Sequence, residues 1–158
     1  SVSRGLGDVY KRQMENSKPY REFGDFLREV FPYKVQKISI NAGFTCPNRD
    51  GTKGFGGCTY CNNQTFSPEY CHTEKSVTEQ LEAGVRFFSR KYPEMKYLAY
   101  FQAYTNTYDE LDSLISKYEE ALACPDVVGL IVGTPPLAFT QSTSFREHLT
   151  SYTMGSPG

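Results

Sequence analysis

The sequence predicts an α/β fold in which parallel strands alternate with helices. Three short apolar runs, near residues 33–40, 96–104 and 127–132, have the composition of strands, and two helical patterns separate them. Strand, helix, strand, helix, strand at this spacing is typical of βαβ units, whose strands pair in parallel. With 158 residues, the chain is long enough for one domain with its own core.

The composition is that of an ordinary globular protein, with 39% hydrophobic and 22% charged residues. The formal net charge of −1 gives no overall field that would favour nucleic acid or an anionic membrane. No stretch reads as a signal peptide or a transmembrane span, and the five cysteines are an odd number. We therefore expect no membrane partner, no disulfide framework, and a cytoplasmic location.

The first predicted elements are a helix over residues 18–31 and a strand over residues 33–40. In the helix, aromatic and aliphatic residues recur at spacings of three and four, and Pro32 ends it. In the strand, β-branched residues alternate with polar ones. Gly43 closes the strand, and a cysteine-rich loop follows directly.

The clearest predicted helix spans residues 76–92. Ser76 and Glu79 have the spacing of a capping box at its start, and Pro93 stops it. The remaining predicted elements are a strand over residues 96–104 that is buried on both faces, a helix from residue 107 or 108 to residue 123, and a third buried strand over residues 127–132.

The two ends of the chain do not share this pattern. Residues 8–13 resemble the translation of a transposon end that is used to build sequencing libraries, so residues 1–13 read as a non-native tail and Met14 as the native start. The alternative for residues 1–13 is a disordered polar tail. Residues 135–158 are rich in Ser, Thr and Pro where another helix is expected. One hypothesis is a frameshift, because codons for residues 138–142 can be chosen so that a neighbouring frame reads Ile-His-Pro-Glu. We expect the folded core within residues 14–134.

The loop after the first strand carries the strongest chemical signal. Cys46, Cys58 and Cys61 fall within sixteen residues, and glycines are frequent between the first two. Thiolates packed this closely, without a secretory context, usually hold a metal centre. An iron–sulfur cube held by three cysteines leaves one iron open to a small ligand. A structural zinc site needs a fourth ligand, which Cys71 or His72 would supply, so spacing alone leaves the two metals balanced.

The place of the loop favours a catalytic centre. It follows the first strand of a βαβ series, and therefore lies at the carboxyl end of that strand. Active sites of barrels and open α/β sheets are built at this edge. Zinc ribbons more often occur in small modules built on hairpins.

Three segments carry a resemblance to a known family. They are NAGFTCPNRDG at residues 41–51, GGCTYCN at residues 56–62, and YFQAYTNTY at residues 100–108. The chain resembles the radical S-adenosylmethionine (SAM) proteins, specifically the bacterial YhcC-type branch, which is akin to the radical SAM domain of the elongator catalytic subunit. The spacing C-x11-C-x2-C is longer than the commoner C-x3-C-x2-C and is the form this branch uses. The resemblance covers about residues 14–134.

The resemblance implies the N-terminal portion of a partial, TIM-like (β/α) radical SAM barrel and a [4Fe–4S] cluster on the three cysteines. SAM would bind the open iron. An electron donor would reduce the cluster, and SAM would then split into methionine and a 5′-deoxyadenosyl radical that abstracts hydrogen from an unknown substrate. Kinship to the elongator subunit makes RNA one candidate substrate. The positions implied as SAM contacts are Tyr60 beside the adenine, and Gln102, Thr105 and Asn106 near the amino group.

The sequence also departs from the family pattern. The Gly-Gly-Glu pattern common elsewhere in the superfamily is absent, so Gln102, Thr105 and Asn106 have a second interpretation as turn and cap residues. After Thr134 stands Pro-Pro-Leu, where this branch has Arg-Pro-Asp. The competing functional interpretation is a noncatalytic zinc-binding module that uses the residues Cys46, Cys58, Cys61, and Cys71 or His72.

Overall fold

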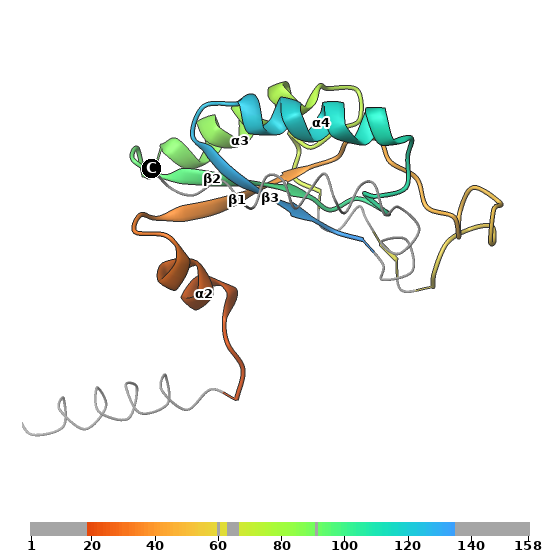
Figure 1. Cartoon of the computed structure of the whole chain (residues 1–158), viewed down its shortest axis with the longest axis horizontal. Coiled ribbons are helices and arrows are strands. Elements are labelled where there is room, and N and C mark those ends of the chain that lie inside the picture. The colour runs from red at the N-terminus through yellow and green to blue at the C-terminus, as the bar shows by residue number, and fades with distance from the viewer. Residues whose placement is uncertain (1–18, 60, 63–66, 91, 135–158) are drawn as a thin grey trace, which may run out of the picture. The chain divides into compact units, whose positions relative to one another are not determined.

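The structure is a computed structural model that describes residues 19–59, 61–62, 67–90 and 92–134 (Figure 1). It divides into two units, residues 1–34 and residues 35–158, and each is described by itself. Within the described residues, no helix is long and apolar enough to cross a membrane. The predicted segments 1–13 and 135–158 lie outside the described residues.

In the described part of the first unit, residues 19–34, the chain forms the short helix α2, at Phe23–Val30. It confirms the central part of the helix predicted over residues 18–31. The helix ends because Phe31, which precedes Pro32, adopts an extended backbone with φ −113° and ψ 131°. A residue before proline is pushed away from helical angles by the proline ring.

The second unit contains a three-stranded sheet of parallel strands in the order β1-β2-β3. The three predicted strands are therefore confirmed as one parallel sheet, with small changes at their ends. The sheet is open, so the part of the chain that the structure describes shows a mixed α/β layer and not a closed barrel. The strands are β1 at Val35–Ile40, β2 at Lys96–Phe101 and β3 at Val127–Val132.

Strand β2 ends three residues earlier than the sequence predicts. Tyr104 has a φ of 62°, in the left-handed region, so the chain cannot continue as a strand there. The amide of Tyr108 then donates to the carbonyl of Thr105 at 3.1 Å, which closes a turn. Because of this turn, the following helix begins at Leu111, later in the sequence than the predicted residue 107 or 108.

Two helices cover one face of the sheet, α3 at Val77–Ser89 and α4 at Leu111–Ala123. Figure 1 shows them side by side on that face, and they contact each other. The predicted capping box of α3 is present, because the amide of Glu79 donates to Ser76 Oγ at 3.1 Å and the amide of Ser76 donates to Glu79 Oε2 at 2.8 Å.

The core lies between the sheet and these helices. Gly84 of α3 allows close packing on β1, since a Cβ there would lie 2.4 Å from Ile38 Cγ2. The rings of Phe101 and Tyr118 meet edge to face at 4.8 Å between centroids. The Tyr118 hydroxyl donates to the carbonyl of Asn106, and burial raises the pKa of Tyr118. This core holds the carboxyl ends of the strands, where the candidate site lies.

Candidate functional site at the carboxyl edge of the sheet

The loops after the three strands meet at the carboxyl edge of the sheet. Beyond the strand ends, the amide of Gln102 donates to the carbonyl of Ile40 at 3.4 Å, and the amide of Gly133 donates to the carbonyl of Phe101 at 2.8 Å. Parallel pairing therefore continues into the loops. The cysteine loop, residues 41–61, leaves this edge after β1 (Figure 1).

A buried glutamine holds the start of the cysteine loop. The Gln80 side chain is fully buried, donates from Nε2 to the carbonyl of Asn41 at 3.0 Å, and accepts from the amide of Asn41 at 2.9 Å. The same Nε2 donates to the carbonyl of Lys75 at 3.0 Å. The two polar atoms of this buried side-chain amide form three hydrogen bonds, and the two to Asn41 fix where the chain leaves β1.

The cysteine loop folds back on itself. The amides of Arg49 and Asp50 donate to the carbonyl of Cys46 at 2.8 and 3.1 Å. The amide of Gly57 donates to the carbonyl of Asn48 at 3.0 Å, which brings the second cysteine back beside the start of the loop. Gly57 has a φ of 81°, a conformation that glycine adopts without strain.

The Asn48 side chain reaches a cysteine sulfur of the loop directly. Asn48 Nδ2 donates to Cys58 Sγ at 3.4 Å. The amide of Cys61 donates to the carbonyl of Cys58 at 3.0 Å, so the last two cysteines share one tight turn. The loop is therefore an internally bonded unit that contains the three predicted metal ligands, Cys46, Cys58 and Cys61.

The three thiols of the loop, those of Cys46, Cys58 and Cys61, are half-buried. Across the residues that the structure describes, no three side chains of the His, Cys, Asp or Glu types gather as a metal-ion ligand set. The backbone brings the three cysteines into one loop, and their side chains do not converge on a common point. Predicted contact Tyr60 lies outside the described residues.

The other cysteines occupy different surroundings. Cys71 is 2% exposed, and burial raises the pKa of its thiol to about 11. Cys124 is half-buried at the end of α4, and burial raises the pKa of its thiol as well. His72 is exposed. The fourth ligand that a zinc site needs would thus come from a core thiol or a surface histidine.

The predicted contacts after β2 differ in their burial. Gln102 is half-buried, whereas Thr105 and Asn106 are buried. The amide of Thr105 donates to the carbonyl of Thr45 at 3.2 Å, which joins this loop to the cysteine loop. The carbonyl of Thr105 also accepts from the amide of Tyr108, so Thr105 takes part in a turn, which is compatible with its second interpretation as a turn or cap residue.

Asn106 connects the loop after β2 to the end of β3. Its amide and its Nδ2 both donate to the carbonyl of Gly133, at 3.1 and 2.7 Å. Its Oδ1 is buried, and within the described part of the chain no group donates to it. A buried amide oxygen without a donor is unusual and leaves an acceptor at the carboxyl edge of the sheet.

Two contacts that sequence reasoning missed join the cysteine loop to the loop after β2. Thr52 Oγ1 lies 2.9 Å from the hydroxyl of Tyr108. The Arg49 guanidinium lies over the Tyr104 ring, 5.1 Å from its centroid. Tyr104 and Tyr108 belong to the segment at residues 100–108 that carries the family resemblance. That resemblance was the sequence signal that could have pointed to these two contacts.

Comparison with known proteins places the chain beside a group of bacterial and archaeal proteins. It is 43% identical over 123 residues to Protein YhcC of Escherichia coli K12, which covers 78% of this chain and 38% of that protein. This chain is similar to YhcC. It is also 40% identical over 121 residues to Uncharacterized protein YtqA of Bacillus subtilis, covering 75% of this chain and 37% of YtqA. Uncharacterized protein MJ0486 of Methanocaldococcus jannaschii is 28% identical over 119 residues.

The likeness to YhcC and YtqA agrees with the YhcC-type resemblance of the three segments, as a similarity to those proteins. The chain spans 38% of the length of YhcC, so the activity of a whole protein of this kind is a matter for proposal. No protein-family model matches the chain. No solved structure matches it. The kinship to radical SAM proteins stays a prediction from the sequence.

Proposed function

We propose that this chain is part of a radical SAM enzyme in which Cys46, Cys58 and Cys61 hold a [4Fe–4S] cluster. The observation that carries the proposal is the cysteine loop itself. Three half-buried cysteine thiols occupy one internally bonded loop at the carboxyl edge of a parallel sheet. Active sites of α/β folds are built at this edge, and thiolates are the usual ligands of iron–sulfur clusters.

The surroundings of the thiols suit a cluster in a second way. The Asn48 amide donates to Cys58 Sγ, and hydrogen bonds to ligand sulfur tune the potential of an iron–sulfur centre. The glycines beside Cys58 let backbone amides approach closely. The proposal rests on the donor set and on the loop that connects it, since the thiols do not converge in the structure.

When bound and reduced by one electron from a donor, such a cluster supplies the electron that splits SAM into methionine and a 5′-deoxyadenosyl radical. The chain's own contribution would be to hold SAM at the edge of the sheet. We assign this role to Gln102, Thr105 and Asn106, with Tyr60 beside the adenine. Asn106 has the strongest physical support, because its buried Oδ1 is an acceptor that an ammonium group would satisfy.

The zinc-binding alternative fits the structure less well. A zinc ligand thiol must lose its proton, and burial raises the pKa of Cys71 to about 11. Recruiting Cys71 would also take a side chain that is 2% exposed out of the core. His72 is exposed and belongs to no ligand group among the described residues. Three cysteines without a fourth protein ligand are the arrangement that a SAM-binding cluster uses.

The test is formation of 5′-deoxyadenosine. The chain is reconstituted anaerobically with iron and sulfide, reduced with dithionite, and supplied with SAM, and the products are separated by chromatography. We expect 5′-deoxyadenosine from the wild-type chain and none from Cys58→Ala, while Cys124→Ala behaves as wild type. A reconstituted, reduced chain that neither binds nor cleaves SAM would refute the SAM assignment.

A further inference from the structure

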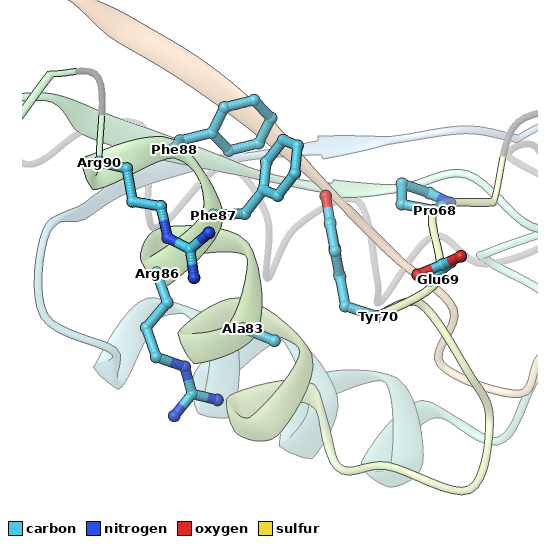
Figure 2. A pocket seen from close by; sticks show the side chains of 8 residues that line it. All are labelled: Pro68, Glu69, Tyr70, Ala83, Arg86, Phe87, Phe88 and Arg90. Carbon is cyan, nitrogen blue, oxygen red and sulfur yellow. The ribbon is translucent and has the colours of Figure 1, made fainter.

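A pocket lies beside α3, and none of its lining residues belongs to the cysteine loop. Its volume is about 640 Å³. Figure 2 shows side chains of α3 on one side and the segment at residues 68–70 on the other. The volume falls within the range of roughly 300–1,000 Å³ that is usual for small-molecule sites. The lining residues are Pro68, Glu69, Tyr70, Ala83, Arg86, Phe87, Phe88 and Arg90.

Two arginines dominate the charge of this pocket. Arg86 and Arg90 are exposed and stand four residues apart, so they lie on the same face of the helix end. Figure 2 shows both side chains on the same side of α3. Neither forms an ion pair with any described residue. Two like charges at this spacing repel each other, which an anion bound between them would relieve.

Aromatic rings adjoin the arginines. Phe87 is 63% exposed, although it is a large apolar side chain, and its ring meets Phe88 edge to face at 5.1 Å between centroids. Tyr70 lines the same pocket from the segment opposite α3 (Figure 2). The Tyr70 hydroxyl forms a hydrogen bond with the backbone of Ser39, and burial raises the pKa of Tyr70. The side chain is therefore a neutral phenol that does not repel an anion.

We propose that this pocket binds a small ligand that joins a phosphate to a flat aromatic ring, of the nucleoside monophosphate class. Guanidinium groups bind phosphate oxygens through paired N–H donors, which suits Arg86 and Arg90. Exposed aromatic rings stack on nucleobases, which suits Phe87. Glu69, on the other side of the pocket in Figure 2, offers an acceptor for a sugar hydroxyl or a base amino group.

A purely structural account explains only part of the pocket. Cations in the last turn of a helix interact favourably with its dipole, and Arg86 lies in the last turn of α3. That account gives no reason for the large ring of Phe87 to stand exposed on the same helix as the two arginines. A phosphorylated aromatic ligand explains the charge, the exposed ring and the volume together.

The test is equilibrium dialysis of the chain against labelled AMP, without iron or sulfide. We expect saturable binding of about one AMP per chain, with inorganic phosphate and adenosine each binding at least tenfold more weakly. The double variant Arg86→Ala/Arg90→Ala and the single variant Phe87→Ala should each weaken AMP binding on the order of tenfold. SAM, which carries no phosphate, should not displace AMP, so this result is independent of the cysteine loop.

The matched control is Arg28→Ala/Lys75→Ala, which removes two exposed positive charges outside the pocket. We expect it to change AMP affinity less than twofold. Equal AMP binding by the Arg86→Ala/Arg90→Ala variant would overturn the proposal, and so would no AMP binding at all. Binding confined to a short single-stranded RNA, or a dimer in size-exclusion chromatography that Phe87→Ala dissociates, would assign the pocket to a different occupant and also overturn it.

Discussion

The hydroxyl of Tyr108 lies 2.9 Å from Thr52 Oγ1, and this contact joins the loop after β2 to the middle of the cysteine loop. The two residues are 56 positions apart in the sequence. The stacking of Arg49 on Tyr104 makes a second connection between the same loops. The cysteine loop is therefore held from outside as well as by its own hydrogen bonds, and the position of the proposed cluster depends on both.

Removing the Tyr108 hydroxyl should loosen the loop and leave the fold intact. For Tyr108→Phe we expect the free energy of unfolding to fall by at most about 1 kcal/mol, because an exposed hydrogen bond adds little net stability. Loss of iron from the reconstituted chain to a chelator should become several times faster. Tyr104→Phe is the matched control, because it keeps the ring under Arg49. Equal rates of iron loss from both variants would show that the contact does not hold the loop.

Gly57 should tolerate substitution poorly, in contrast to Gly54. Gly57 has a φ of 81°, and a Cβ there would lie 2.7 Å from Arg49 Nε. Gly54 needs no left-handed conformation, and a Cβ there would come no closer than 3.7 Å to Asn48. We expect Gly57→Ala to reduce iron incorporation markedly and Gly54→Ala to leave it near the wild-type level, both measured by iron content per chain. Similar iron content in the two variants would contradict the loop geometry.

The packing of α3 on β1 predicts an energetic coupling between Gly84 and Ile38. A methyl group at position 84 would clash with Ile38 Cγ2, so Gly84→Ala should lower the free energy of unfolding by roughly 1–2 kcal/mol despite better helix propensity. In an Ile38→Ala background the clashing atom is gone, and the same change should be neutral or stabilising. Urea unfolding of the four chains measures this coupling. An equal cost of Gly84→Ala in both backgrounds would contradict it.

Burial of the Cys71 thiol predicts a loss of stability at alkaline pH. Its pKa rises from 9.0 to about 11 in the folded chain, so the unfolded chain loses this proton first as the pH rises. The Cys71 thiol makes its full contribution to the free energy of unfolding below pH 9.0. This contribution declines between pH 9.0 and about pH 11, by roughly 2–3 kcal/mol at most.

Urea unfolding across this pH range measures the effect. Cys71→Ala should unfold at lower urea throughout, with a shallower decline in the free energy of unfolding between pH 9.0 and about pH 11. The decline should not vanish, because burial also raises the pKa of Tyr97 and Tyr118. An unchanged decline in Cys71→Ala would show that this thiol does not couple to folding.

The order of strands and helices could be predicted from the sequence because hydrophobic periodicity is a local signal. The capping box at Ser76 and the parallel pairing of β1 with β2 were both confirmed. The place of the cysteine loop followed from this order, since a loop after a strand of a βαβ unit must lie at its carboxyl end.

Other parts of the site depend on contacts between distant residues, which a periodic pattern does not encode. The left-handed Tyr104 ends β2 early, and tyrosine itself gives no sign of that conformation. The buried Oδ1 of Asn106, to which no described group donates, depends on the contact between the loop after β2 and the end of β3 at Gly133. The pocket beside α3 is lined by both Tyr70 and Phe87, which are far apart in the sequence.

Iron and sulfide analysis of the chain after anaerobic reconstitution measures whether Cys46, Cys58 and Cys61 hold a cluster. We expect about four iron and four sulfide ions per chain and a broad absorbance in the blue. Both should be lost in Cys46→Ala, Cys58→Ala and Cys61→Ala, and kept in Cys124→Ala. A colourless chain that retains one zinc ion, or full iron content in any of the three loop variants, would contradict it.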